Sequence, residues 1–219
     1  MHKDLIIILK EGAGEIGVSL NHQMIEMFMV YLKELKEWNQ KINLTSLKKD
    51  TAIIIKHFID SLTLVPHIPS KATLLDIGSG AGFPGIPVKI AKPSINVTML
   101  EAKSKKVNFQ RHLIRKFGLT SIRSIQDRAE NLKTENGFYL RFDMVTTRAF
   151  SRLDKFLLLA LPFVKKGGFI IAMKGKHVKE ELKENQDMLK GFALEESRIE
   201  GLKLPFGGGE RYLIFLKKI

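Results

Sequence analysis

The chain has 219 residues, of which 44% are hydrophobic and 27% are charged, an ordinary composition for a globular protein. Lysine and arginine number 36 against 23 acidic residues, so the formal net charge is +13. No cysteine is present, which excludes disulfides, thiolate metal sites and any mechanism with a cysteine nucleophile. We predict no metal site, and one core domain with an appendage rather than two full domains.

The first apolar stretch, residues 5–9, is only five residues long and is flanked by Lys3, Asp4 and Lys10. It is too short to span a membrane, and it lacks the form of a secretory signal. We therefore expect a cytoplasmic protein without a membrane partner.

Two amphipathic helices are predicted in the first seventy residues. Across residues 21–38 apolar side chains recur at steps of three and four, and residues 51–64 show a similar pattern that two prolines end. Residues 1–70 are therefore predicted to form a helical cap. His57 and Asp60 lie on the second helix, where a structural role, capping or bridging to the main domain, is favoured over catalysis.

Residues 71–219 alternate between strand and helix patterns. This alternation predicts an α/β domain with a mostly parallel, seven-stranded sheet that is covered on both faces. The predicted strands are residues 73–75, 96–100, 121–125, 142–146, 168–173, 193–199 and 212–217. The predicted helices are residues 85–92, 103–117, 153–163 and 178–190.

Residues 74–87, LLDIGSGAGFPGIP, connect the first of these strands to a helix. Gly78, Gly80 and Gly82 occupy alternate positions, where the chain needs positive φ angles and a side chain would fill the space beside a ligand. The helix that follows offers free N–H groups to a carboxylate or phosphate. The pattern is typical of a cofactor-binding loop, and a glycine-rich turn without a ligand is the alternative.

Glu101 ends the next strand, where a doubly wound sheet places an acid that binds ribose hydroxyls. Nicotinamide dehydrogenases and methyltransferases that use S-adenosylmethionine share this arrangement. Dehydrogenases require G-x-G-x-x-G, whereas this chain has G-x-G-x-G after Asp76, which resembles the first motif of class I methyltransferases. The expected fold is therefore that of a Rossmann-like class I S-adenosylmethionine-dependent methyltransferase, with S-adenosyl-L-methionine as cofactor and S-adenosylhomocysteine as product.

Further short motifs occur along most of the chain, in an order and at spacings that are specific together. They are Trp38-Asn39, Asn43-Leu44-Thr45, His57 with Asp60-Ser61-Leu62, residues 76–87, Arg148-Ala149-Phe150, Lys174-Gly175 and Gly209-Glu210-Arg211. With these motifs the chain resembles the small-subunit ribosomal RNA guanine-N7 methyltransferase G family, once called glucose-inhibited division protein B. The resemblance implies a bacterial enzyme that methylates N7 of a guanine in 16S ribosomal RNA, with this RNA or the small ribosomal subunit as its partner.

The resemblance also implies which residues form the site. Arg148, after the fourth strand, should face both cofactor and substrate and position the substrate for catalysis; an ion pair with Asp143 or Asp154 is the alternative. Asp127 competes with Glu130 for the adenine amine. The expected cofactor-binding residues are Asp76, Gly78, Gly80, Gly82 and Phe83 in the loop, Glu101, Ala102 and Lys103 around the adenosine, Ala129 and Glu130 at the adenine, and Arg148.

Residues that this chain lacks limit the methylation reactions that it can catalyse. Carbon-5 methylation of pyrimidines needs a cysteine, and methylation of exocyclic amines typically uses an Asn/Asp-Pro-Pro-aromatic motif where this chain has Thr-Thr-Arg-Ala, residues 146–149. Guanine N7 has a bare lone pair on the major-groove edge, so its methylation needs positioning rather than a general base. Arg148 is a candidate donor to guanine O6. The alternatives are a class I methyltransferase for another RNA or a small molecule, and a binding protein that senses the cofactor.

The positive charge is distributed unevenly. Residues 1–70 contain eight basic and eight acidic residues, so the whole excess lies in residues 71–219. The neutral cap is therefore expected to brace the fold rather than to contact phosphates. A basic surface beside a methyl donor favours a nucleic acid substrate, and a solvated lysine-rich face is the alternative. Basic residues gather on the predicted helix 103–117 (Lys103, Lys105, Lys106, Arg111, Arg115 and Lys116) and around the fifth strand, where Lys165, Lys166, Lys174 and Lys176 are the predicted RNA contacts.

The sequence leaves the form of the substrate open among free RNA, an assembly intermediate and the complete subunit. It does not determine the oligomeric state either, although a monomer is expected.

Overall fold

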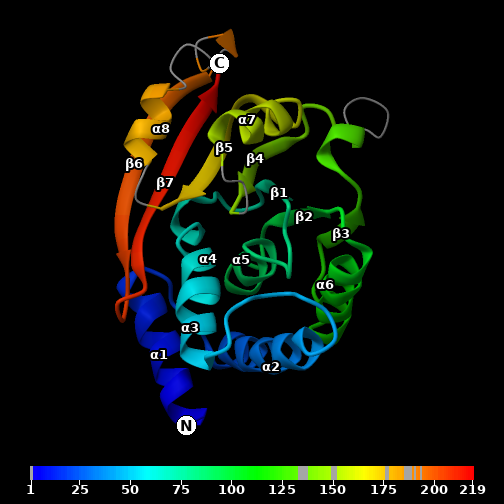
Figure 1. Ribbon diagram of the computed structural model, residues 1–219, viewed down its shortest axis with the longest axis vertical. Coiled ribbons are helices and arrows are strands. Elements are labelled where there is room, and N and C mark those ends of the chain that lie inside the picture. Colours follow the sequence, from blue (N-terminus) through cyan, green and yellow to red (C-terminus); the bar gives the residue numbers. More distant parts are fainter. Residues whose placement is uncertain are drawn as a thin grey trace.

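The computed structural model describes residues 2–132, 138–148, 152–175, 178–184, 189, 191–192 and 194–219. Its centre is a seven-stranded sheet with the strand order β3-β2-β1-β4-β5-β7-β6 (Figure 1). The first five strands in this order are parallel, and β7 pairs antiparallel with β5 and β6. The prediction of a mostly parallel, seven-stranded sheet is confirmed. The strands are β1 (Thr73–Ile77), β2 (Asn96–Glu101), β3 (Ile122–Gln126), β4 (Phe142–Thr147), β5 (Val164–Lys174), β6 (Leu194–Leu204) and β7 (Gly209–Lys218).

The two faces of the sheet carry separate cores, because neighbouring residues of a strand point to opposite sides. Leu74 packs on one face with α5, α6 and the N-terminal helices, whereas Leu75 packs on the other face with α7. The α-helices are α1 (His2–Glu15), α2 (His22–Asn39), α3 (Asp50–Ile53), α4 (Asp60–Leu62), α5 (Gly85–Ala91), α6 (Ser104–Lys116), α7 (Leu153–Ala160) and α8 (Val178–Glu184). The other helical segments are η1 (Ile54–Ile59), a π-helix, and the 3₁₀ turns η2 (Val65–His67) and η3 (Ala129–Leu132). No helix in the described part of the chain is long and apolar enough to cross a membrane.

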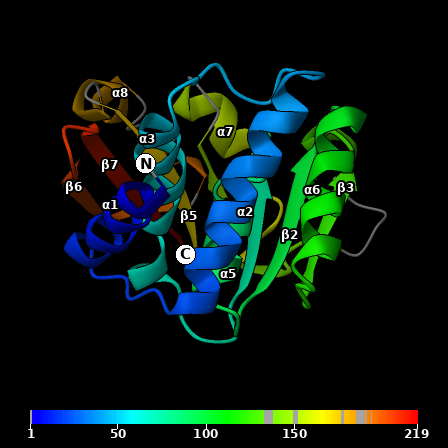
Figure 2. The same cartoon turned by 90° about the horizontal axis from the view of Figure 1, so that it is seen from below.

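The helical cap shares the first core with the sheet. α3, η1 and α4 follow one another without a break, so residues 50–62 form one helix, as predicted, although its π-helical middle is not predicted. Phe28 on α2 and Phe58 on η1 are fully buried, with ring centroids 5.1 Å apart. Figure 2 shows α2 lying beside α6, where Glu34 pairs with His112 at 2.7 Å. The cap is therefore packed directly on the helices that cover the sheet.

α1 is a helix that the sequence pattern does not predict. Its buried residues Leu5, Leu9 and Ala13 follow one another at steps of four, but two glycines interrupt the helical pattern. Gly12 permits close packing, because a Cβ there would lie 2.4 Å from the Cδ1 atom of Ile59. Gly12, which weakens the helical pattern in the sequence, thus serves the contact of α1 with η1.

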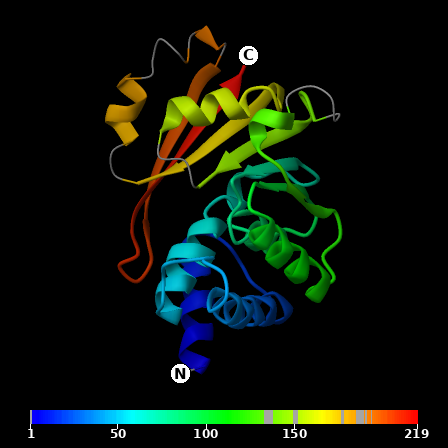
Figure 3. The same cartoon turned by 45° about the vertical axis from the view of Figure 1, so that its right-hand side comes forward.

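The last three strands are longer than predicted. β5 begins at Val164, which pairs with Phe142 across a register shift in β4. The β6–β7 hairpin extends past the sheet to the N-terminal helices (Figure 3). Its turn packs closely there, since a Cβ on Gly208 would lie 2.4 Å from Cγ2 of Ile55 on η1. The hairpin therefore brings the start of β7, and with it Arg211, beside α4.

Candidate active site

The carboxyl ends of β1, β2 and β4 meet at one edge of the sheet. Because β1 and β2 are parallel and Ile77 pairs with Leu100, the loop after β1 lies beside Glu101. Asp76 pairs with Thr146 of β4, so Arg148 comes to the same edge. The structure thus brings the glycine loop, Glu101 and Arg148 together.

The glycine loop has the backbone that its spacing predicts. Gly78, Gly80 and Gly82 have φ angles of 72°, 57° and 97°. A Cβ on Gly82 would lie 2.9 Å from the hydroxyl oxygen of Tyr31, whereas one on Gly80 would meet only the carbonyl oxygen of Gly78, at 3.9 Å. The loop is therefore closed by the cap at Gly82 and open at Gly80, where a ligand can approach the backbone.

Tyr31 on α2 holds this loop from the cap side. Its hydroxyl donates a hydrogen bond to the carbonyl oxygen of Ala81 at 2.5 Å, and its ring stacks on Phe83 at 5.3 Å. Burial raises the pKa of Tyr31 well above 10, so the hydroxyl remains a donor. Phe83, which the resemblance places at the cofactor, is buried, and its ring packs on the cap.

Asp76 orients the start of α5. Its Oδ2 atom accepts a hydrogen bond from the backbone N–H of Gly85 at 2.9 Å. Its Oδ1 atom is buried and has no hydrogen-bond partner among the residues that the structure describes. Burial raises the pKa of Asp76 well above its usual value, against the opposing effects of the Gly85 N–H and the positive charge of Arg148.

Glu101 links the glycine loop to the start of α6. One carboxylate oxygen accepts from the backbone N–H of Gly80 and the other from that of Lys103, each at 2.9 Å. The residue is only 8% exposed. Each carboxylate oxygen retains a second lone pair, so this acid can accept from ribose hydroxyls while it holds the loop.

A pocket of about 230 Å³ opens beside this acid, between the ends of β1 and β2 and the segment that begins η3. Asp127 and Glu130 both line it, and Asp127 already accepts from the backbone N–H of Arg128 at 2.7 Å. Leu159 of α7 adds an apolar wall. An adenosine fits this lining. The carboxylates can accept from its hydroxyls and its amine, and the apolar wall and the bare glycine backbone leave room for its rings. The predicted residues that line the pocket are Gly78, Glu101, Ala102, Ala129 and Glu130.

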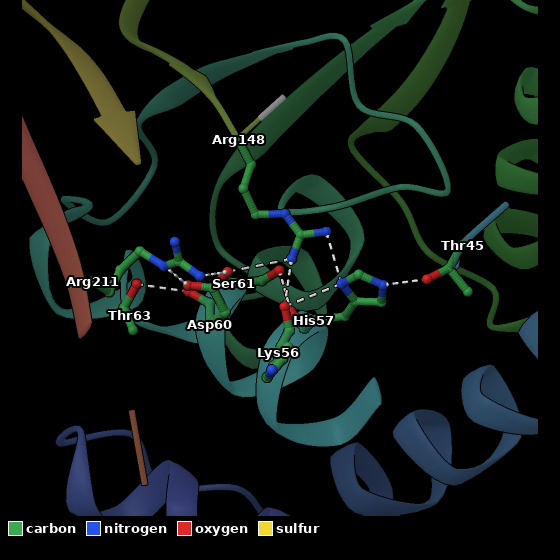
Figure 4. Close-up of polar contacts among 8 residues, drawn as sticks. All are labelled: Thr45, Lys56, His57, Asp60, Ser61, Thr63, Arg148 and Arg211. Carbon is green, nitrogen blue, oxygen red and sulfur yellow. Dashed lines mark hydrogen bonds and ion pairs between the residues drawn. The ribbon is translucent and has the colours of Figure 1, made fainter. Parts of the chain in front are cut away.

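Arg148 points from the end of β4 into the cap (Figure 4). Its guanidinium donates to the carbonyl oxygen of Lys56 at 3.0 Å and lies 3.0 Å from Nδ1 of His57. It also pairs with Asp60 at 3.5 Å and lies over the ring of Phe83, 4.9 Å from its centroid. One cation thus contacts both the cap helix and the glycine loop.

The ion pairs that the sequence offers as alternatives for Arg148 do not form. Asp143 pairs with Lys165 at 3.0 Å, and Asp154 pairs with Arg152 at 2.5 Å. That alternative is wrong. Arg148 pairs instead with Asp60, a buried acid of the cap that is far from it in the sequence.

Asp60 is the acid that joins the two parts of the chain. It is 1% exposed, and its two oxygens accept from Arg211 of β7 at 2.5 and 3.0 Å. Arg148 approaches the same carboxylate from β4. The expectation that His57 and Asp60 bridge to the main domain is confirmed.

His57 is held as a neutral ring. Burial, and next the charge of Arg148, lower the pKa of His57 from 6.5 to about 3. Since Arg148 can only donate, Nδ1 accepts from it, and the Nε2–H group donates to the hydroxyl of Thr45 at 2.7 Å. The ring also stacks on Phe83 at 4.6 Å. Both ring nitrogens of His57 are therefore engaged.

Several of the family motifs meet in this network. Asn39, Thr45 and Arg211 join His57 and Asp60 there. Sequence reasoning gave Asn39, Thr45 and Arg211 no individual role, and their presence in short family motifs was the only signal for them. Tyr31 and Leu159 gave no such signal, because helical periodicity marks them as ordinary core residues.

The prediction that Lys174 lies on an open edge beside the cofactor is wrong. The residue is only 8% exposed and pairs with Glu181 at 2.9 Å. Because α8 follows β5 closely, its first acidic turn covers the end of the strand. Lys176, together with Ala149 and Phe150 of the family motif, lies outside the described residues.

Lys165 and Lys166 lie at the amino-terminal end of β5. All five parallel strands point their carboxyl ends toward the cofactor edge, so these lysines lie at the opposite edge of the sheet. Lys165 is also paired with Asp143. The prediction that lysines around β5 form one basic surface beside the cofactor is therefore wrong.

The sequence of this chain matches a known protein family over most of its length. Residues 24–210 match the family model described as rRNA small subunit methyltransferase G. Proteins named ribosomal RNA small subunit methyltransferase G from Desulforamulus reducens and Syntrophus aciditrophicus are 40% and 41% identical to this chain. The matches cover 99% and 96% of this chain and 91% and 88% of those proteins.

Solved structures share the fold at low sequence identity. A SAM-dependent methyltransferase from Aquifex aeolicus matches with a TM-score of 0.57 and 16% identity, over 77% of this chain and 93% of that one. M. jannaschii TYW2 in complex with AdoMet matches with a TM-score of 0.61 and 14% identity, over 82% of this chain and 80% of that one. These likenesses establish the class I methyltransferase fold, and the sequence matches establish that the chain belongs to the rRNA small subunit methyltransferase G family.

Proposed function

We propose that this protein transfers the methyl group of S-adenosylmethionine to N7 of a guanine in 16S ribosomal RNA. Membership of the family and the pocket beside Glu101 support this function. When bound, S-adenosylmethionine supplies a methyl group on a positively charged sulfur, which a lone pair of the substrate can attack.

The residues proposed to bind the cofactor surround the open side of the glycine loop. Glu101 accepts hydrogen bonds from the ribose hydroxyls while it also accepts from the N–H of Gly80 in the loop. Either Glu130 or Asp127 accepts from the adenine amine, since both line the pocket. Asp76 orients the start of α5 behind the loop, and its Oδ1 atom, which has no partner among the described residues, is the acceptor proposed for the cofactor ammonium. The backbone of Gly78 and Gly80 forms the floor against which the cofactor lies.

Among the described residues, the two candidate bases that contact Arg148, His57 and Asp60, are both engaged, and this observation carries the choice of N7. Arg148 and Thr45 engage the two ring nitrogens of His57, and two arginines bind the carboxylate of Asp60. Neither of these two candidate bases can therefore accept a proton from a substrate. Methylation of an exocyclic amine requires proton removal, whereas the lone pair of N7 attacks without it.

Arg148 is proposed to position the guanine by donating to its O6 atom. A cation beside a purine that becomes positively charged raises the barrier by electrostatic repulsion. Asp60 lies 3.5 Å from Arg148 and offsets part of this charge. The pair thus allows a donor to be placed beside the purine at a lower electrostatic cost.

We further propose that the substrate is 16S rRNA, free or in the small ribosomal subunit, and that the protein acts in the cytoplasm as a monomer. The net charge of +13 supports a polyanionic partner.

The test is methyl transfer from labelled S-adenosylmethionine into RNA from cells that lack this gene, offered both as free 16S rRNA and as small subunits. We expect label in N7-methylguanosine after digestion to nucleosides, and single-turnover rates that are nearly constant between about pH 6 and 8.5. Label in an amine-methylated nucleoside, or a rate that rises tenfold per pH unit, would contradict the proposal. Transfer only to small molecules would favour the alternative enzyme class.

A further inference from the structure

A second, larger cleft lies next to the cofactor pocket. Its volume is about 570 Å³, and its walls are residues 39–43 of the cap and the start of α6. Ala102 lines both this cleft and the cofactor pocket, so the two are contiguous. Polar residues that line it include Lys41, Asn43, Lys103, Lys105 and Lys106.

The lysines of this cleft are not held in ion pairs by the residues that the structure describes. Lys41, Lys103, Lys105 and Lys106 form no ion pair with any residue that the structure describes. The nearby acids are engaged elsewhere: Asp50 pairs with Lys36 at 2.7 Å and Glu34 with Lys116 at 2.8 Å. Glu101 is bonded to two backbone N–H groups. The cleft therefore presents four lysines that no acid in the described part of the chain pairs with, beside the buried carboxylate of Glu101.

The cap wall of the cleft is held in place before any ligand binds. The side chain of Asn39 accepts from the N–H groups of Leu44 and Thr45 at 2.8 and 2.9 Å and donates to the carbonyl oxygen of Thr45 at 3.0 Å. Thr45 in turn is bonded to His57, which contacts Arg148. A wall fixed in this way loses little conformational entropy when it binds a partner.

We propose that this cleft binds the RNA strand next to the target guanine through its phosphates, with Lys41, Lys105 and Lys106 as contacts. The inference rests on the proposed function. A side chain cannot read the deep major groove of an A-form helix, so the target must be unpaired or flipped, and its flanking phosphates are then accessible. No aromatic side chain among the described residues lines the cleft, which favours phosphate contacts over base stacking.

Asn43 adds a neutral contact to this surface. Its side chain is exposed at the cleft and has no hydrogen-bond partner in the described part of the chain. An amide can donate to a phosphate or ribose oxygen and accept from a ribose hydroxyl. The cap thus takes part in binding RNA, although its summed charge is zero.

The test compares two triple variants of the full chain with equal change in charge. The cleft variant is Lys41→Ala, Lys105→Ala and Lys106→Ala, and the control is Lys10→Ala, Lys155→Ala and Lys217→Ala, three exposed lysines on α1, α7 and β7. Binding of a 16S rRNA transcript is measured across salt concentrations. Three lost phosphate contacts should flatten the slope of log affinity against log salt by about 2 units in the cleft variant, with no change in the control.

Further readouts separate binding of RNA from folding and from cofactor binding. Melting temperature and S-adenosylmethionine affinity should be unchanged in the cleft variant, and methylation lost at physiological salt should recover at low salt. Arginine at the same three positions should restore the slope. Equal slopes for the cleft and control variants would overturn the inference even when the wild-type protein methylates RNA. Failure of the wild type to methylate any RNA would instead overturn the proposed function.

Discussion

Asp60 and Arg211 are 151 residues apart in the sequence, yet they form a two-point ion pair with N–O distances of 2.5 and 3.0 Å. Asp60 is 1% exposed, and Arg148 lies 3.5 Å from the same carboxylate. One acid on the cap helix thus compensates two cations of the main domain, which makes it the link between the cap and the edge of the sheet.

Replacement of Asp60 should lower the stability of the protein. In Asp60→Asn, two cations lose their counter-charge in a buried environment, and we expect the free energy of unfolding to fall by about 3–5 kcal/mol. Urea unfolding measures this change. Asp154→Asn is the control, since its ion pair with Arg152 lies at the surface, and it should change stability little. Similar losses in both variants would mean that Asp60 does not support the two arginines.

Tyr31→Phe tests the bond between the cap and the glycine loop. The change removes a buried hydroxyl and leaves the carbonyl oxygen of Ala81 without its donor, so we expect a loss of about 1–3 kcal/mol in stability. Thermal or urea unfolding provides the measurement. Tyr139→Phe, at an exposed tyrosine, is the matched control and should be neutral. Unchanged stability in Tyr31→Phe would show that the loop keeps its conformation without the hydrogen bond from Tyr31.

Glu101→Ala should weaken the binding of S-adenosylmethionine by roughly 2–4 kcal/mol, because hydrogen bonds between a charged group and the ribose are lost. From sequence alone, stability is expected to remain unchanged. The structure changes that expectation, since Glu101 also accepts from the N–H groups of Gly80 and Lys103. We now expect a lower melting temperature as well. Calorimetry measures the affinity for S-adenosylmethionine. Glu26→Ala, on the exposed face of α2, is the control. Unaltered affinity in a folded Glu101→Ala protein would show that Glu101 does not bind the cofactor.

His57 should make stability depend on pH. The pKa of His57 is about 3 in the folded protein, against 6.5 in the unfolded chain. Between these values the unfolded chain binds the proton more readily, so the contribution of His57 is complete above pH 6.5 and is lost as the pH falls toward 3. The slope for one proton is at most about 1.4 kcal/mol per pH unit.

The measurement is the difference in unfolding free energy between the wild type and His57→Gln at a series of pH values. Glutamine can accept from Arg148 and donate to Thr45 but does not titrate. The advantage of the wild type should therefore decrease as the solution is acidified. A constant difference from pH 7 to pH 4 would show that the ring of His57 is free to take a proton in the folded state.

The sequence by itself determined the sheet, the glycine loop and the acid that follows it. Gly78, Gly80 and Gly82 stand where the loop requires positive φ, and Glu101 ends the strand that pairs beside them. These features depend on local backbone preferences and on strand order, which short patterns carry. α1 is not predicted from its local pattern, because Gly12 weakens that pattern and serves a tertiary contact with η1.

Only the tertiary structure decided which charged groups meet. Arg148 pairs with Asp60 rather than with a nearby acid, and Glu181 covers Lys174. The net charge of the cap is zero, yet Lys41 of the cap faces the start of α6 across the cleft. The physical reason is that Coulomb energy depends on separation and burial in space, and a count of charges along the chain specifies neither.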